Sequence, residues 1–237
     1  VPLVIGNVGA PQLVPQKSKD LFSPEMVGQA KDLIDADIMA IHLNFHQEVV
    51  QPEGNPNGAG VRDAIRSLAR EYPVMVKETG AGISRDVAER IKGIGIRGID
   101  VAGMGGTSFA AVELYRAMKA GDEIRTNMGE TFFDWGIPSP VSVLETAGCG
   151  LPVIASGGIL DGTHIAASVS LGASCAGVAN AVLREATESA EAVKNKLMVI
   201  REELRAAMLL TGSRDLKALS GARRVILGET RQWIDAL

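Results

Sequence analysis

The sequence has little cysteine and no large excess of charge of either sign, and each of these shortages excludes a class of protein. Its 237 residues include only Cys149 and Cys175, which are too few and too widely spaced for a disulfide framework or a CxxC site. We expect both to be small buried apolar residues of an intracellular protein. Lysine and arginine number 24 against 28 aspartates and glutamates, a net charge of -4. This balance favours neither nucleic acid nor a membrane surface as a partner.

Long apolar runs and linkers are missing as well. No run approaches the ~20 apolar residues of a membrane helix, and no secretory signal is visible, so we expect a cytoplasmic protein. No stretch rich in proline, glycine and serine divides the chain, and we expect one domain over residues 1–237. The chain starts at Val1, without an initiator methionine and inside an apparent strand. We therefore expect that an N-terminal segment is missing.

Hydrophobic residues make up 46% of the chain, enough for a sizeable core. Short apolar runs alternate with amphipathic helical runs, which is typical of parallel βα units. The runs lack polar alternation, as expected for strands that are covered on both faces. Six strands are predicted, at residues 3–7, 38–44, 74–77, 98–102, 152–156 and 173–179. A TIM-type (β/α)8 barrel has eight strands, so we expect an α/β barrel with about six of the eight present.

Helix starts follow from capping residues and proline. Ser23 before Pro24, Ser84, Ser139 before Pro140, and Asp161 or Gly162 each predict a start. Residues 188–210 carry apolar side chains at helical spacing. Residues 121–138 break the alternation and are predicted to form a long loop, either functional or mobile.

Polar or glycine residues follow nearly every predicted strand, where α/β barrels build their active sites. The segment after the second strand is the most informative, with His42, Asn44, Gln47 and Glu48. If the strand stays extended to Asn44, the side chains of His42 and Asn44 face the same way and share a ligand.

Two glycine segments follow the last two strands, at 156–159 and 177–180. Glycine lets the backbone approach an anion, and barrels of this class commonly bind phosphate here. Glycine in tight turns is the simpler alternative. Lys77 ends an apolar strand and is predicted to meet an anion or an electron-rich ring, although it could extend to solvent.

Metal binding is suggested only by carboxylates. Glu48 and Glu53 are candidate Mg²⁺ ligands, or solvated loop acids. His46 and His164 have no supporting pattern, and the glycines at 103–106 lack the spacing of a dinucleotide motif.

These motifs together resemble one family, the type 2 isopentenyl diphosphate isomerases. The resemblance rests on His42-Leu43-Asn44, Gln47-Glu48, Gln51-Pro52-Glu53-Gly54, Ile5-Gly6-Asn7, Val76-Lys77-Glu78-Thr79-Gly80, Gly105-Gly106-Thr107-Ser108, Asp134-Trp135-Gly136-Ile137-Pro138 and Ser156-Gly157-Gly158. The family is an FMN-dependent (β/α)8 barrel that interconverts isopentenyl and dimethylallyl diphosphates. It uses reduced FMN, Mg²⁺ and NADPH as reductant, with no net redox change, and forms homotetramers or homo-octamers.

The resemblance also assigns roles to individual residues. It implies that Gln47 is catalytic, that His42, Asn44, Gln47 and Thr79 bind the isoprenoid diphosphate, and that Glu48 holds Mg²⁺. It implies that FMN is held by Asn7, Lys77, Thr107, Gly157, Gly158 and Ala179.

The chain departs from the family pattern at a few positions and leaves alternatives open. Phe109 stands where the family usually has tryptophan, Thr79 where serine is common, and residues 55–57 where acids often follow. Another FMN barrel, of the 2-hydroxyacid oxidase or glutamate synthase type, would share the glycines and Lys77. A non-catalytic barrel fragment is the third alternative.

Overall fold

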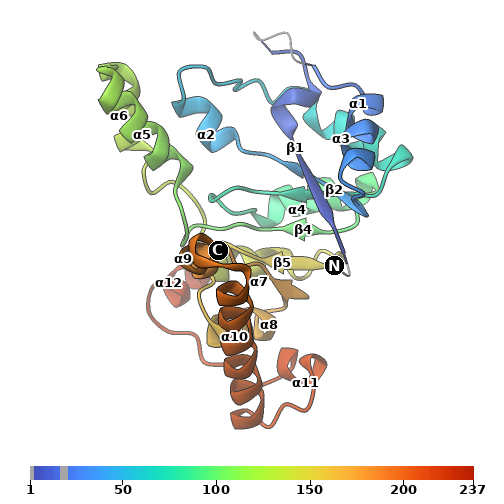
Figure 1. Cartoon of the computed structure of the whole chain (residues 1–237), viewed down its shortest axis with the longest axis vertical. Coiled ribbons are helices and arrows are strands. Elements are labelled where there is room, and N and C mark those ends of the chain that lie inside the picture. The colour runs from blue at the N-terminus through green and yellow to red at the C-terminus, as the bar shows by residue number, and fades with distance from the viewer. Residues whose placement is uncertain (1–2, 17–20) are drawn as a thin grey trace.

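A computed structural model describes residues 3–16 and 21–237, and its centre is a parallel sheet of six strands (Figure 1). The strands lie in chain order, each pairing in parallel with the next: β1 (Ile5–Gly9), β2 (Ile38–His42), β3 (Val74–Lys77), β4 (Ile99–Asp100), β5 (Val153–Ala155) and β6 (Cys175–Ala176). All six predicted strands are confirmed, mostly as shorter segments. The consecutive order, with helices between the strands, confirms the α/β barrel class with six strands present.

The strand register places the carboxyl ends together. His42 lies opposite Lys77, and Lys77 lies opposite Asp100, on neighbouring strands. Strands β2 to β4 are buried on both faces, with Ile41, Val74 and Ile99 among the core residues. Polar side chains therefore gather at one edge of an otherwise apolar sheet.

The helices lie outside the sheet, and four of them begin at the starts that the capping residues predicted. They are α1 (Pro24–Leu33), α2 (Phe45–Val50), α3 (Val61–Glu71), α4 (Arg85–Ile91), α5 (Phe109–Ala120), α6 (Glu123–Thr131), α7 (Ser139–Thr146), α8 (Gly162–Ser170), α9 (Leu183–Glu188), α10 (Ala190–Leu210), α11 (Leu216–Ser220) and α12 (Gly228–Ala236). The side chains of Ser23, Ser84 and Asp161 accept backbone N–H bonds at α1, α4 and α8. Ser139 is the first residue of α7, and the cap position is Pro138; the Ser139 hydroxyl donates to the carbonyl oxygens of Met104 and Gly157. Among the described residues, no helix is long and apolar enough to cross a membrane.

The prediction of a long loop at 121–138 is wrong. Half of this segment is helix α6, whose N-cap is Asp122, the residue just before the helix; the Asp122 carboxylate accepts from the N–H of Arg125. It packs against α5, and the two helices project together from the sheet at the upper left of Figure 1. The sequence did not predict this helix because its apolar pattern is weak: among its residues only Gly129 is buried.

The expectation that both cysteines are buried holds for Cys149 and is wrong for Cys175. Cys175 lies in β6, which pairs with β5 alone among the described strands. Cys175 is therefore only partly covered, at the edge of the described sheet. Helix α10 packs on α8 and adds a small second apolar cluster below the sheet, in which Leu204 and Met208 take part.

Candidate active site

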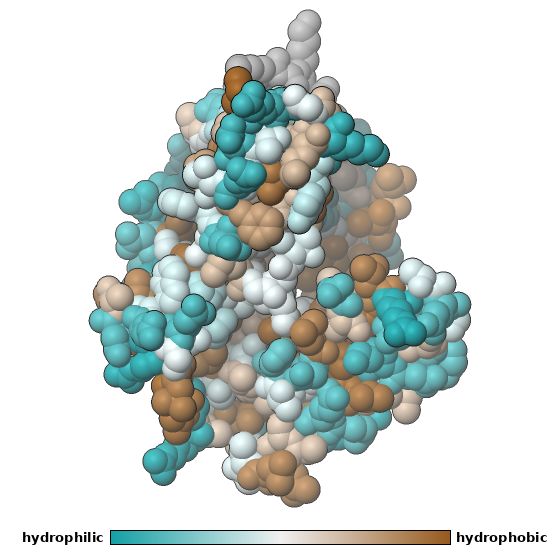
Figure 2. Space-filling view, turned by 90° about the vertical axis from the view of Figure 1, so that its left-hand side faces the viewer, coloured by the Kyte–Doolittle hydropathy of each residue, from teal (hydrophilic) through white to brown (hydrophobic). Residues whose placement is uncertain are grey.

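A cavity of about 710 Å³ opens at the carboxyl edge of the sheet. Figure 2 shows the face on which α2, α5 and α6 lie, with pale, near-neutral surface in its middle between brown and teal side chains. The cavity lining includes all six residues that the resemblance assigns to FMN, together with Thr79: Asn7, Lys77, Thr107, Gly157, Gly158 and Ala179. The structure therefore brings these seven residues together around one cavity. His42, Asn44, Gln47 and Glu48 lie outside its lining.

Glycine backbone forms one wall of the cavity. Gly157 and Gly158 have φ values of +93° and +81°, which side chains of L residues rarely adopt. A Cβ atom at Gly157 would lie 2.1 Å from the carbonyl oxygen of Gly103, and one at Gly158 would lie 2.3 Å from that of Gly105. The two glycine loops therefore pack backbone to backbone, and both line the cavity, where their main chain is not covered by side chains.

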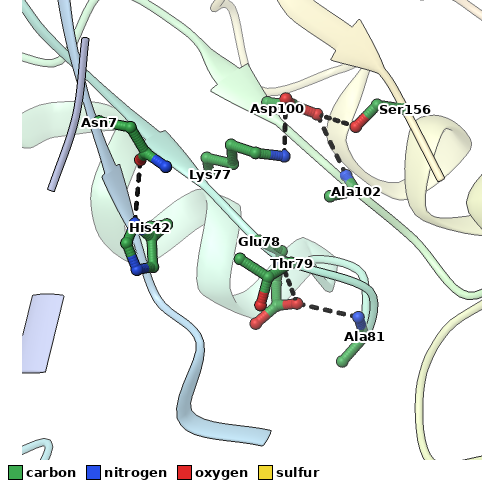
Figure 3. Close-up of polar contacts among 9 residues, drawn as sticks. All are labelled: Asn7, His42, Lys77, Glu78, Thr79, Ala81, Asp100, Ala102 and Ser156. Carbon is green, nitrogen blue, oxygen red and sulfur yellow. Dashed lines mark hydrogen bonds and ion pairs between the residues drawn. The ribbon is translucent and has the colours of Figure 1, made fainter. Parts of the chain in front are cut away.

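A partly buried ion pair lies in the lining of the cavity (Figure 3). The Nζ atom of Lys77 lies 3.1 Å from Oδ2 of Asp100. The other carboxylate oxygen, Oδ1, accepts from the backbone N–H of Ala102 at 3.2 Å and from the hydroxyl of Ser156 at 2.5 Å. Lys77 is thus held by a neighbouring strand and does not extend freely to solvent.

His42 and Asn7 form a second polar pair, on β2 and β1 (Figure 3). Nδ1 of His42 lies 2.9 Å from Oδ1 of Asn7, so Nδ1 carries the donated proton. Burial, and then the charge of Lys77, lower the pKa of His42 below its usual value of 6.5. The imidazole is consequently neutral at pH 7, with Nε2 left as an acceptor.

The expected extended arrangement of His42 and Asn44 is wrong. Asn44 has φ 53° and ψ 13° at the start of α2, and its Oδ1 accepts from the hydroxyl of Thr79 at 2.8 Å. A left-handed residue turns the chain away from the strand, so His42 and Asn44 have different partners. Nearby, burial raises the pKa of Glu78, against the effect of the Ala81 and Thr79 N–H groups that donate to its carboxylate.

Gln47 is oriented by a carboxylate that the sequence did not single out. Its Nε2 donates to Oε1 of Glu113 at 2.6 Å, and Glu113 is 1% exposed. Oε2 of Glu113 accepts from Arg116, which also donates to Glu53. The amide of Gln47 thus stands at the end of a chain of charged groups between α2 and α5.

The two candidate metal ligands are in different situations. Glu53 is more than half exposed, and one of its oxygens, Oε1, already pairs with the cation of Arg116. Glu48 is buried, and its Oε2 accepts from Gln51 Nε2 at 3.0 Å and from the Asn55 N–H at 2.6 Å. In the described part of the chain, no three His, Cys, Asp or Glu residues form a group that could hold a metal ion. Glu48 alone could offer one oxygen to Mg²⁺, which retains several waters.

Helix α6 holds α2 at the edge of the site. Nη1 of Arg125 donates to the carbonyl oxygen of Val49 at 2.9 Å, and Nε2 of His46 lies 2.9 Å from the carbonyl oxygen of Phe132. Phe132 and Trp135 contact each other edge to face, with ring centroids 5.7 Å apart. The segment at 121–138 therefore supports the helix that carries Gln47 and Glu48.

Two acids in the site, Glu113 and Asp100, were missed, although the sequence held a signal for each. Glu113 lies among the buried residues Ala110, Ala111 and Leu114 on one face of α5. Asp100 interrupts the apolar run of β4. A carboxylate inside an apolar pattern is costly unless it is paired, and this cost marks it for a role.

Comparison with known proteins places the chain in a family. The sequence profile of the FMN-dependent dehydrogenase family matches residues 63–225. An isopentenyl-diphosphate delta-isomerase of Thermoplasma volcanium is 43% identical over 99% of this chain and 67% of its own length. One of Methanothrix thermoacetophila is 44% identical over 98% of this chain and 63% of its own length. The chain thus spans between 63% and 67% of the length of these two relatives.

Solved structures support the same fold. A mandelate oxidase variant that carries a monooxide FMN adduct superposes with a TM-score of 0.59 at 20% identity, over 86% of this chain and 59% of that chain. At this identity the likeness concerns the fold alone. From the profile match and the two curated relatives, the chain belongs to the FMN-dependent dehydrogenase family and, within it, to the isopentenyl-diphosphate delta-isomerases.

Proposed function

We propose that this chain carries the flavin pocket and most of the substrate site of an enzyme that isomerises isopentenyl diphosphate to dimethylallyl diphosphate. The observation that carries the proposal is the convergence of Asn7, Lys77, Thr107, Gly157, Gly158 and Ala179 on one cavity. Family membership supplies the reaction, and the cavity supplies a place for its cofactor.

The residues present fit FMN. A cavity of about 710 Å³ is within the usual range for cofactor sites. The glycine wall suits a phosphate, because Gly157 and Gly158 line the cavity without side chains and leave their backbone open to an anion. The ammonium group of Lys77, in the lining of the cavity, would supply positive charge beside the electron-rich flavin ring.

The substrate diphosphate would lie beside the flavin, at His42, Asn44 and Thr79. Thr79 lines the cavity and bonds to Asn44, while His42 faces Asn7 across the first two strands. Glu48 would add one oxygen to a Mg²⁺ ion that the diphosphate and water complete.

The chemistry requires a proton to be added to an alkene and another to be removed from the adjacent carbon. Bound reduced FMN supplies acid and base groups for this exchange without net oxidation. Gln47 presents a neutral amide fixed by Glu113, and a neutral group suits a site where positive charge develops. Helices α2 and α5 keep that amide in place, so that it need not reorganise during the reaction.

The resemblance adds further parts to the proposal. NADPH would reduce the flavin, the protein would act in the cytoplasm as a homotetramer or homo-octamer, and residues 1–237 would form one domain.

The test is an FMN titration followed by an isomerase assay. We expect saturable quenching of flavin fluorescence by this chain. We also expect dimethylallyl diphosphate, detected by proton NMR, when reduced FMN, Mg²⁺ and isopentenyl diphosphate are present. The Gln47→Ala variant should bind FMN with unchanged affinity and lose turnover at least a hundredfold. Absence of flavin binding in the wild type, or full turnover in Gln47→Ala, would contradict the proposal.

A further inference from the structure

We propose that Asp100 is a positioning residue that holds the ammonium group of Lys77 in the cavity, and so sets how strongly the protein prefers reduced over oxidised flavin. The inference rests on the proposed FMN site. It assigns a role to a residue that neither the sequence pattern nor the family resemblance singled out.

The geometry divides the two oxygens of Asp100 between two tasks. Oδ1 is fixed by Ala102 and Ser156, from the chain just beyond β4 and β5. Oδ2 is then directed at Nζ of Lys77, 3.1 Å away, on the adjacent strand β3 (Figure 3). The carboxylate is therefore locked from one side and offers its free side to the lysine.

Burial makes this arrangement costly for the fold. Asp100 is 9% exposed, and a buried ion pair seldom stabilises a protein more than apolar residues of equal size would. Both side chains also line the cavity, where an apolar pair would serve the core as well. The pair is better explained by the ligand than by stability.

An isosteric change shows what Asp100 contributes. In Asp100→Asn, the amide oxygen takes the position of Oδ1, because the Ala102 N–H and the Ser156 hydroxyl both donate hydrogen bonds there. The amide NH₂ then faces the ammonium of Lys77, donor against donor. The lysine side chain is 28% exposed and flexible, so the ammonium can leave the lining of the cavity for water.

The measurement is the affinity of this chain for oxidised and for reduced FMN, taken anaerobically on wild type, Asp100→Asn, Lys77→Met and the double variant. We expect the preference for reduced FMN to fall about tenfold in Asp100→Asn, which lowers the two-electron potential by about 30 mV. Lys77→Met should show a similar fall, and the double variant should fall no further, because both changes remove the same ammonium.

Asp86→Asn is the matched control. It makes the same chemical change at an exposed carboxylate of α4 that does not line the cavity, so the preference of this variant for reduced FMN should change less than threefold. Circular dichroism checks the fold of each variant, and Asp100→Ser replaces Asp100→Asn if the latter does not fold.

The outcomes separate this inference from the proposed function. If the wild type binds no FMN, both fail. The wild type could instead bind FMN while Asp100→Asn leaves the preference for reduced FMN unchanged or raises it, or while the double variant shows the sum of the two single losses. Asp100 then does not act through Lys77, and only the positioning role is overturned.

Discussion

His42 illustrates how one neighbour fixes the state of a residue. Its Nδ1 proton is donated to Asn7, and burial together with Lys77 keeps the pKa low, so Nε2 of the free protein has no proton to give. A diphosphate accepts hydrogen bonds and donates none at neutral pH. As long as Nδ1 donates to Asn7, a hydrogen bond from Nε2 to the substrate requires the imidazolium form, with both nitrogens as donors.

This coupling predicts that binding of isopentenyl diphosphate takes up a proton. The free His42 has a lowered pKa and is neutral above it, so the affinity should weaken as the pH rises from 7 to 8.5, by up to about tenfold per pH unit. Calorimetry of the FMN-loaded protein, in buffers of different ionisation enthalpy, measures the proton directly.

The His42→Gln variant is the control for that titration. Glutamine keeps a donor without a titrating group, so its affinity should be flat across this pH range. An equal slope in both proteins would show that the proton goes elsewhere and that His42 does not contact the diphosphate.

At the level of single residues, the sequence predicted which residues surround the cavity and failed on what holds them. Strand ends and glycines are local signals, and they identified Lys77 and Gly157, whereas Asn7, expected at the end of a strand 3–7, lies in the middle of β1. The partners of Gln47 and Lys77 come from other elements, 66 residues away in the case of Glu113. Such pairs depend on packing, which no local pattern contains.

Among the elements, α2 is the one on which the site depends most, and it is short. It spans Phe45–Val50, too few residues for a stable isolated helix. Contacts from α6 compensate, with the guanidinium of Arg125 at the C-terminal end of α2, where the helix dipole favours a cation.

Arg125→Ala should therefore loosen α2. We expect a loss of about 1 kcal/mol in the free energy of unfolding, seen as a fall of about 2–4 °C in the melting temperature. Hydrogen exchange should increase at the amides of α2.

Arg66→Ala is the matched control, since Arg66 makes only a surface ion pair with Asp63 within α3. Its cost should be below about 0.5 kcal/mol. Equal losses in the two variants, or unchanged exchange in α2, would contradict a supporting role for α6.

The elements themselves were predicted well wherever burial was continuous. Apolar runs identified six strands, and Ser23 and Asp161 marked helix starts. Helix α6 was missed because it lies on a neighbouring helix with little apolar surface, and a loop and an exposed helix then have similar composition. The lengths of two strands were overestimated, because β4 and β6 have only two paired residues each.

The whole molecule is an open sheet in its described part, with β1 and β6 at the two edges. An uncovered parallel edge presents unpaired N–H and C=O groups, which favour pairing with other chains. Cys175 reports on this edge, because it lies in β6 and is exposed, whereas Cys149 is buried near the core.

We therefore expect a thiol reagent to modify one cysteine per folded chain, Cys175, and both after denaturation. Burial, with the carboxylate of Asp100, raises the pKa of this thiol, so the reaction should be slow at pH 7 and accelerate as the pH rises. Cys175→Ser should abolish the modification of the folded chain. If the native chain protects both thiols, and light scattering shows an oligomer, then β6 is covered by another copy, and the open edge exists only in the isolated chain.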